Sequence, residues 1–451
     1  MSKIRLHGSS SGYTEIAPVA ASGNNTLTLP NDGTIISKDA NGAVGVTSVV
    51  TTTATITTAK VGAAVTISES GIEASGIGIT CANIHGTQIG GRRNLIINGA
   101  MNLAQRGTAA VASIGYQSVD RMQLDAGSGI DETPSQEQGT VASGTTPYTE
   151  GFRKTLKITN GNQTTSVASN TDLYFQVLHK FESQDIASSG WDYTNPNSFI
   201  TLSFWVKSSV AQEFYARLQT SDGTSYNYPF STGSLSANTW TKVVKKIPGN
   251  SNLQFDNDVN QGLAIEWVMY RGTGKTGSYA TLNTWKVYDA SQRVPDMAST
   301  YYETNDATYE LTGVQFEVGS QATPFEYRSH QEELHLCKRY YQRYPEGPTA
   351  DNYGCVPSAV MVCNNTTTTY YCPTLNPTMR SSPSFSTSGN FRMNGTSSVN
   401  NVAVTAIGVY HNGAATPFQY ATVASGLTAG QAVALSVNND ATAYIAYSAE
   451  L

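Results

Sequence analysis

Short segments in which apolar and polar residues alternate recur along much of the chain. The clearest are residues 199–207, 213–219 and 263–270. One face of these segments is apolar and comprises Ile200, Leu202, Phe204, Val206, Phe214, Ala216, Leu218, Ile265, Trp267 and Met269. The other face carries Thr201, Ser203, Trp205, Tyr215, Arg217, Gln219, Glu266 and Tyr270. Alternation with a period of two predicts antiparallel β-strands that bury one face against a core.

The first 92 residues show a different pattern. Residues 4–6, 13–16 and 26–30 are short alternating segments separated by turns. After the threonine-rich tract at 47–58, isoleucines recur between glycines up to Ile89 with few charges. We expect an extended β stalk in which several chains share one narrow core, because a lone chain would leave these strand edges unpaired. A disordered linker is the alternative, since Ser, Gly and Thr dominate this segment.

Strand spacing suggests three domains. Residues 93–334 carry strands of six to nine residues at the spacing of a β-sandwich. Residues 335–451 contain shorter apolar strands at 359–362, 402–410 and 443–447, which predict a smaller β domain. We place the boundary near residues 332–337, where the charged sequence RSHQEE interrupts the strands. The predicted fold class is therefore all-β, with an N-terminal stalk, a central sandwich and a C-terminal β domain.

Composition narrows the function classes. Charged residues make up 13% of the 451 residues, against about 25% in an average soluble domain. The net charge is -6 and basic residues form no cluster larger than a pair, which argues against nucleic-acid binding. The sequence MSKIRLHGSSSGYTE at the start has no apolar core, and no later stretch reaches about 18 apolar residues. We therefore expect no secretory signal and no membrane insertion.

Several motifs, taken in order, resemble those of the carbohydrate-binding-module-like jelly rolls of bacteriophage tail fibres. They are NLIING (94–99), QRG (105–107), YQSVDR (116–121), FESQD (181–185), LSFWVKS (202–208), LTGVQFEVG (311–319) and ATPFE (322–326). The start of the chain, with GSSSGY (8–13) and NTLTLP (25–30), resembles the N-terminal segments of fibre proteins from environmental phages.

This resemblance implies a jelly-roll β-sandwich in an elongated homotrimeric fibre on the surface of a virion. Residues 1–92 would bind other virion proteins, and the sandwich would bind host surface polysaccharide without cleaving it. Weak sites gain avidity when three copies act together. A structural head or tail fibre without a specific receptor is one alternative. A polysaccharide-depolymerising tailspike is another, although the sandwich spacing differs from that of a long parallel β-helix.

Aromatic and polar side chains on the face opposite the predicted core are the candidate glycan ligands. Sugars place an apolar ring face on an aromatic side chain, while their hydroxyls bond to Arg, Glu and Gln. If the three alternating strands share one sheet, one platform would contain Trp205, Tyr215, Arg217, Gln219, Glu266 and Tyr270. Trp191 and Tyr193 could provide a loop-tip site, or Trp191 could anchor the loop. The platform strands could also pack under a loop or against another subunit.

Other chemical motifs are weak. Residues 256–262 (DNDVNQG) resemble a calcium loop, but Trp267 replaces the expected bidentate Glu, which favours a polar turn. A structural calcium elsewhere cannot be placed, and we expect no other cofactor. His330 and His335 are five residues apart, so they miss the H-E-x-x-H spacing of a zinc protease. The spacing of the five cysteines fits no metal-binding framework and suggests free thiols. The basic and aromatic run KRYYQRY (338–344) suits either an acidic ligand or a strand covering a domain join.

Overall fold

The computed structural model describes residues 92–451 except 128, 165–166, 168–169, 346–353 and 396–398, together with five strands before residue 92. The chain forms two compact units, Met1–Thr80 and Cys81–Leu451. The second unit contains both the predicted sandwich and the predicted C-terminal domain.

The first unit contains two small antiparallel sheets. Strands β1 (Ile4–His7) and β2 (Tyr13–Ile16) form a pair. Strands β3 (Thr58–Val61), β4 (Val65–Ser68) and β5 (Gly71–Ala74) form a meander. The strands predicted at 4–6 and 13–16 are confirmed. The predicted strand at 26–30 and the isoleucines beyond residue 74 lie outside the described residues, so the shared-core stalk stays a prediction.

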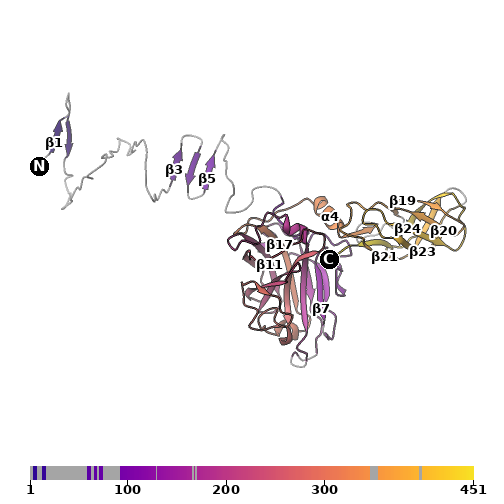
Figure 1. The fold of residues 1–451 in the computed structure, drawn as a ribbon, viewed down its shortest axis with the longest axis horizontal. Helices are drawn as coiled ribbons and strands as arrows, with labels where there is room; N and C mark the ends of the chain where they lie inside the picture. Colours follow the sequence, from indigo (N-terminus) through magenta and orange to yellow (C-terminus); the bar gives the residue numbers. More distant parts are fainter. Residues whose placement is uncertain are drawn as a thin grey trace. The chain divides into compact units, whose positions relative to one another are not determined.

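Residues 111–318 supply two six-stranded antiparallel sheets. Sheet 1 has the order β16-β13-β12-β15-β10-β7 and comprises β7 (Gln123–Gly127), β10 (Tyr174–Glu182), β12 (Gln212–Thr220), β13 (Tyr226–Leu235), β15 (Gln261–Arg271) and β16 (Lys286–Val287). Sheet 2 has the order β14-β11-β17-β9-β8-β6 and comprises β6 (Val111–Ala112), β8 (Ser135–Thr140), β9 (Lys154–Thr159), β11 (Phe199–Ser208), β14 (Thr241–Pro248) and β17 (Thr308–Val318). Several of these strands are labelled in Figure 1.

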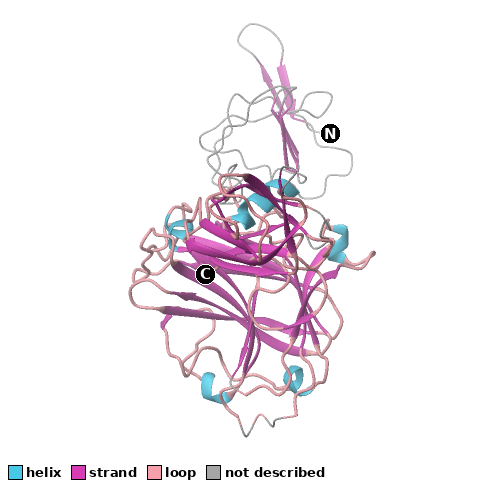
Figure 2. Ribbon diagram, turned by 90° about the vertical axis from the view of Figure 1, so that its right-hand side faces the viewer, coloured by secondary structure: helices cyan, strands magenta, loops and turns pink. Residues whose placement is uncertain are grey.

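Helix is scarce in this part of the chain. The short helices are α1 (Thr146–Thr149), α2 (Ser183–Ala187), the 3₁₀ turn η1 (Thr273–Lys275) and α3 (Thr300–Glu303). Strands and loops make up nearly everything else in Figure 2. The all-β class predicted from the alternating pattern is confirmed.

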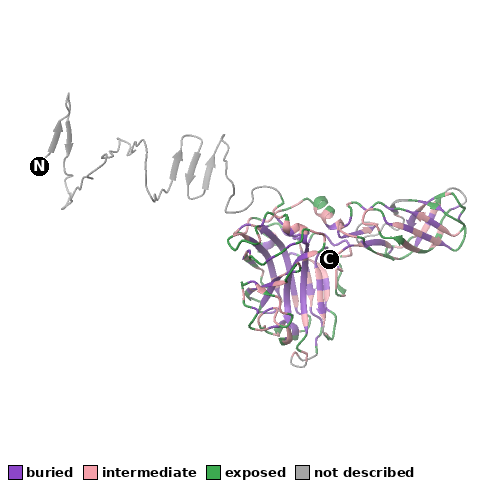
Figure 3. Ribbon diagram, viewed as in Figure 1, coloured by how far each residue is buried: buried purple, intermediate pink, exposed green. Residues whose placement is uncertain are grey.

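The inner faces of the two sheets form one hydrophobic core, seen as buried runs along the strands in Figure 3. Phe204 of sheet 2 meets Trp267 of sheet 1 edge to face, with ring centroids 5.9 Å apart. All ten residues predicted to face inward belong to this core. Their burial follows from the period of two, because alternate side chains of a strand point to the same side.

Tyr270 was predicted to face outward, and this is wrong. Tyr270 pairs with Phe175, but the next pair is Val268 with Gln176, so Met269 is an extra residue in β15. A bulge of this kind reverses the alternation beyond it. Tyr270 therefore enters the core and stacks on Tyr302 with centroids 5.0 Å apart, and Arg271 takes the outward position.

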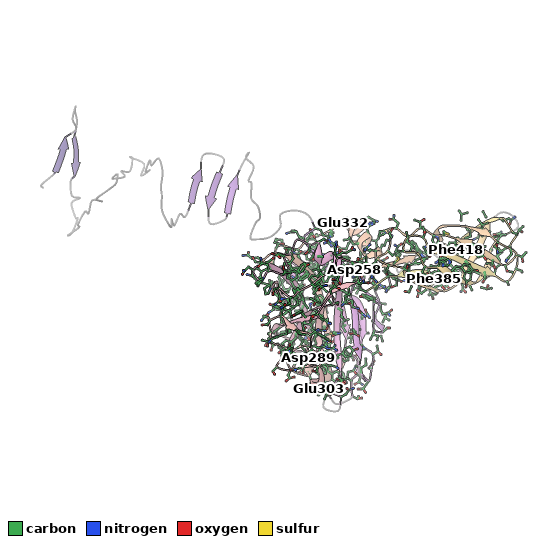
Figure 4. All side chains as sticks on the ribbon, viewed as in Figure 1. Asp258, Asp289, Glu303, Glu332, Phe385 and Phe418 are labelled. Carbon is green, nitrogen blue, oxygen red and sulfur yellow. The ribbon has the colours of Figure 1, made fainter. Side chains whose placement is uncertain are left out.

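Residues beyond 340 build a second core. Strands β18 (Tyr341–Tyr344), β26 (Tyr444–Ser448) and β21 (Ser384–Ser388) form a three-stranded sheet in that order. A closed barrel comprises β19 (Cys355–Cys363), β20 (Thr368–Tyr371), β24 (Phe418–Val423), β23 (Val402–His411), β22 (Phe391–Gly395) and β25 (Ala432–Val437). Figure 4 labels Phe385 on β21 and Phe418 on β24. The strands predicted at 359–362 and 402–410 fall within β19 and β23, and the strand predicted at 443–447 overlaps β26, which begins and ends one residue later.

Helix α4 (His330–Lys338) crosses the domain boundary predicted at residues 334–335. The Ser329 side chain caps it by accepting a hydrogen bond from the Glu332 amide at 3.2 Å. Cys337 near its end packs with Tyr340 against Ile97 and Leu103 of the preceding part of the chain. The charged, strand-poor stretch is thus a helix packed on the sandwich, and no linker separates the two parts at this position.

Candidate functional site

The predicted platform does not form as one surface. Trp205 lies on β11 of sheet 2, whereas Tyr215, Arg217 and Glu266 lie on β12 and β15 of sheet 1. Trp205 is therefore on the opposite outer face of the sandwich from the other residues. Periodicity assigns a residue to a face of its own strand, but it does not say which sheet the strand joins.

On sheet 1, an ion network lies where the platform was predicted. Arg217 donates from Nε and Nη2 to the two carboxylate oxygens of Glu266, at 2.8 and 2.6 Å. Arg271 donates from Nη2 to Glu266 Oε2 at 2.8 Å. Arg217 also donates to Gln219 Oε1 at 2.7 Å, so the sequence pattern correctly placed Arg217, Gln219 and Glu266 on one face.

This network is buried. Arg217, Glu266 and Arg271 have at most 5% of their side chains exposed, because residues between β15 and α3 cover this face. Tyr215 packs with Val268 of β15 and with Val294 of the covering segment. Only Gln219 is partly exposed among the sheet 1 candidates. The side chains predicted to meet a glycan instead hold the sheet and its covering segment together.

The loop-tip candidates have different environments. Trp191 is 3% exposed and belongs to the sandwich core, so it anchors its loop. Tyr193 is partly buried and packs edge to face on Phe255, with centroids 4.9 Å apart. Of the two readings of Trp191 left open by the sequence, the loop anchor agrees with the structure.

The outer face of sheet 2 carries an open hollow of about 790 Å³ beside Trp205. Its walls include Phe325 and Tyr327 from the segment after β17, together with Lys242 and Val244 of β14 and Glu150. Tyr327 is 51% exposed and Val244 48%, and the two lie in the same hollow, so apolar surface is accessible there. The hollow thus combines accessible aromatic and aliphatic surface with two charged groups.

Backbone and aromatic contacts fix the position of Tyr327. Its hydroxyl donates to the carbonyl of Glu150 and lies against Gly151. Gly151 has φ +107°, and a Cβ there would be 2.6 Å from the Tyr327 hydroxyl, so only glycine suits this position. The Phe325 ring packs against both Phe152 and Tyr327, with centroid distances of 4.9 Å in each case, and Phe152 and Tyr327 also contact each other.

Buried polar contacts hold the segment that carries these rings across sheet 2. The Glu326 amide donates to Gln315 Oε1 at 2.7 Å, and the Thr323 amide donates to Glu317 Oε1 at 2.8 Å. Gln315 and Glu317 are outward residues of β17 and are buried under this segment. The aromatic wall of the hollow is therefore preorganised.

Glu150 is the polar centre of the hollow. The Trp205 indole donates from Nε1 to Glu150 Oε2 at 3.0 Å, and Lys242 Nζ lies 3.1 Å from the same oxygen. The Lys242 and Glu150 side chains are 39% and 37% exposed, so both can exchange this contact for a ligand. Burial, followed by the charge of Glu150, raises the pKa of Tyr327.

Sequence reasoning selected Trp205 but missed Phe325 and Tyr327. The motif ATPFE contains Phe325, yet neither aromatic belongs to an alternating strand, so periodicity offered no signal for them. Their role depends on a non-strand segment folding back over sheet 2.

The residues that the sequence offered as possible metal ligands can be examined in the described part of the chain. In the loop at 256–262, Asp258 (labelled in Figure 4) accepts from the Asn260 amide at 2.9 Å, which makes a polar turn. Within the described residues, no three His, Cys, Asp or Glu side chains gather as metal ligands would. Cys337, Cys363 and Cys372 are free thiols. No described helix has the length and apolar character needed to cross a membrane.

No family model and no curated protein matches the sequence. Structural matches include the enzymatically active domain of bacteriophage CBA120 tailspike protein 4, at 9% identity and a TM-score of 0.27 over 50% of this chain and 21% of that one. A putative sugar binding protein from Bacteroides thetaiotaomicron matches at 8% identity and a TM-score of 0.26, over 50% of this chain and all of its own. The CBM22-1 xylan-binding domain of Paenibacillus barcinonensis Xyn10C matches at 11% identity and a TM-score of 0.23, over 49% of this chain and all of its own. This chain thus spans about a fifth of the tailspike chain. TM-scores this low decide neither fold nor function.

Proposed function

We propose that this chain is a subunit of a homotrimeric bacteriophage fibre that binds host surface polysaccharide without cleaving it. The fibre assignment is supported by the ordered motifs between residues 94 and 326 and by the N-terminal segment that resembles fibre proteins. The assignment to polysaccharide binding is supported chiefly by one observation, the aromatic hollow on sheet 2.

The residues of the hollow suit a sugar ring. A pyranose can lay its apolar face on the exposed Tyr327 ring, while Lys242 donates to and Glu150 accepts from its hydroxyls. An exposed ion pair stabilises a fold by only about 0–1 kcal/mol, so opening the Lys242–Glu150 contact costs little. Trp205 acts beneath the ligand by positioning Glu150 rather than by stacking on the sugar.

Replacing Tyr327 with alanine is expected to weaken polysaccharide binding at least tenfold, which corresponds to about 1.4 kcal/mol. The loss follows from removal of the exposed ring, so Tyr327→Phe should bind within about threefold of the parent chain. Binding is measured by interferometry against immobilised neutral and acidic polysaccharides, including xylan, alginate and pectin.

Tyr279→Ala is the matched control for this experiment. Tyr279 is also exposed, at 39%, and lies beside a lysine, Lys286, but it is outside the hollow. Equal binding by Tyr327→Ala and Tyr279→Ala would contradict the assignment of the hollow. Steady release of reducing sugar from a bound polysaccharide would contradict the non-catalytic role. Alanine at Trp205 or Tyr270 is less informative, because both side chains are buried.

The purified chain is expected to have a solution mass of three times 48.1 kDa by light scattering. The reason is that the short strands before residue 92 cannot bury enough apolar surface alone. A variant lacking residues 1–92 should shift toward lower mass if these residues supply the shared core. A full-length chain that remains a monomer at micromolar concentration would rule out the trimeric fibre.

A further inference from the structure

A second cavity, of about 420 Å³, lies inside the unit Cys81–Leu451, away from the sheet 2 hollow. Arg106 and Tyr116, from the segment before β7, form one side. The other side belongs to the three-stranded sheet and includes Tyr341 and Arg343 of β18, Ser386 of β21 and Tyr444 of β26. Its volume lies within the range of about 300–1,000 Å³ typical of small-molecule sites.

Direct hydrogen bonds join the two sides of this cavity. Gln105 donates from Nε2 to the Tyr341 carbonyl at 3.1 Å. Arg343 donates from Nη1 to the carbonyls of Gln105 and Arg106, at 3.3 and 3.2 Å. The basic and aromatic run at 338–344 therefore does cover the join between the sandwich and the C-terminal sheet, and two of its side chains also line the cavity.

The two arginines of the cavity differ in their partners. Arg106 stacks on Tyr341, with its guanidinium carbon 3.6 Å from the ring centroid, and pairs with Glu450 at 3.2 Å. Arg343 lies 4.6 Å from the Tyr444 centroid, but it forms no ion pair within the described part of the chain. Its Nη1 is hydrogen-bonded, whereas its Nε is buried without a partner.

Two other arginines of this chain show what an Nε and Nη2 pair of donors binds. Arg217 holds Glu266, and Arg339 holds Glu182, in both cases with Nε and Nη2 on the two oxygens of one carboxylate. In Arg343 the backbone contacts occupy Nη1 and leave Nε and Nη2 without a partner among the described residues. Side-on pairing with a carboxylate would satisfy both and neutralise the charge.

We infer that this cavity binds an acidic saccharide through its carboxylate, with Arg343 as the partner of the carboxylate. The tyrosine rings of Tyr116, Tyr341 and Tyr444 surround the apolar part of the sugar, and Ser386 offers a hydroxyl to its hydroxyl groups. That the ligand is a saccharide rests on the proposed function. That it carries a carboxylate rests on the contacts of Arg343. The inference adds a second site and indicates that the bound polysaccharide contains uronic acid.

The test compares methyl galacturonoside with methyl galactoside by calorimetry on the full-length chain at neutral pH. The acid should bind at least tenfold more tightly, and Arg343→Gln should remove most of that difference. Arg153→Gln is the matched control, because Arg153 also stacks on a tyrosine, Tyr148 at 3.8 Å, and donates to two backbone carbonyls. Equal affinity for the two sugars, or undiminished binding by a folded Arg343→Gln, would overturn the inference.

A second pair of variants keeps the test valid if Arg343→Gln unfolds. Ser386 is exposed on β21, so Ser386→Glu places a competing carboxylate at the cavity while Arg343 itself is retained, and Thr387→Glu places the same charge on the next exposed residue outside the cavity lining. Only Ser386→Glu should weaken galacturonoside binding. If acetate binds as tightly as the galacturonoside, the inference that the ligand is a saccharide is refuted. Loss of polysaccharide binding by Tyr327→Ala together with undiminished galacturonoside binding by Arg343→Gln would refute this cavity but not the sheet 2 hollow, so the two failures are separate results.

Discussion

Replacing Glu266 with glutamine is expected to lower the free energy of unfolding by about 3–5 kcal/mol. Glu266 is the one carboxylate bonded to both Arg217 and Arg271, and all three side chains are at most 5% exposed. The neutral amide would leave two buried guanidinium groups without a counter-charge, and neither could reach bulk water. Urea unfolding followed by tryptophan fluorescence measures the change.

The stability of the Glu266→Gln variant should also depend on pH differently from that of the parent chain. Burial by itself raises the pKa of Glu266, but Arg217 and Arg271 outweigh burial and hold the pKa below its usual value. A carboxylate with a lowered folded pKa stabilises the fold above its unfolded pKa of about 4.3, and this contribution is lost as the pH falls through the folded pKa. The parent chain should therefore lose stability in acid, and Glu266→Gln should lose less.

Glu137→Gln provides the comparison for Glu266→Gln. Glu137 is bonded to Lys157 at 2.8 Å, but both side chains are partly exposed, at 28% and 33%. Water can solvate either group when its partner is removed, so we expect a change below about 1 kcal/mol. Similar losses for the two variants would contradict a buried, mutually dependent network on sheet 1.

Replacing Trp267 with alanine is expected to lower the free energy of unfolding by about 3–5 kcal/mol, the range for deleting a large aromatic side chain from a core. Trp267 is fully buried on the inner face of β15 and contacts Phe204 of the opposite sheet. The lost ring therefore leaves a void between the two sheets, which backbone hydrogen bonds within each sheet cannot close.

Trp267→Phe should cost less, because it retains a ring that can meet Phe204 and leaves a smaller void. Trp240→Ala tests the loss of a tryptophan that is only partly buried. Equilibrium unfolding of the three variants should therefore rank Trp267→Ala as the most damaging. A loss below about 1 kcal/mol for Trp267→Ala would contradict a tightly packed interface between the sheets.

Several features of this protein could be predicted from local sequence alone. The alternating segments determine strands β11, β12 and β15 and the residues they bury, because a strand sends alternate side chains to opposite sides whatever its neighbours are. The same rule correctly brought Arg217, Gln219 and Glu266 to one face. Five predicted glycan ligands on these strands are nevertheless buried, namely Trp205, Tyr215, Arg217, Glu266 and Tyr270.

Only the tertiary structure decided which strands share a sheet and what covers their outer faces. Trp205 is separated from Arg217 because β11 joins β14 and β17, and a single bulge turns Tyr270 inward. Tyr327 and Arg343 became candidates through contacts with residues that are distant in sequence, Glu150 and Gln105. The physical reason is that periodicity records a side chain's direction relative to its own strand, whereas strand pairing, bulges and non-strand segments determine what that side chain meets.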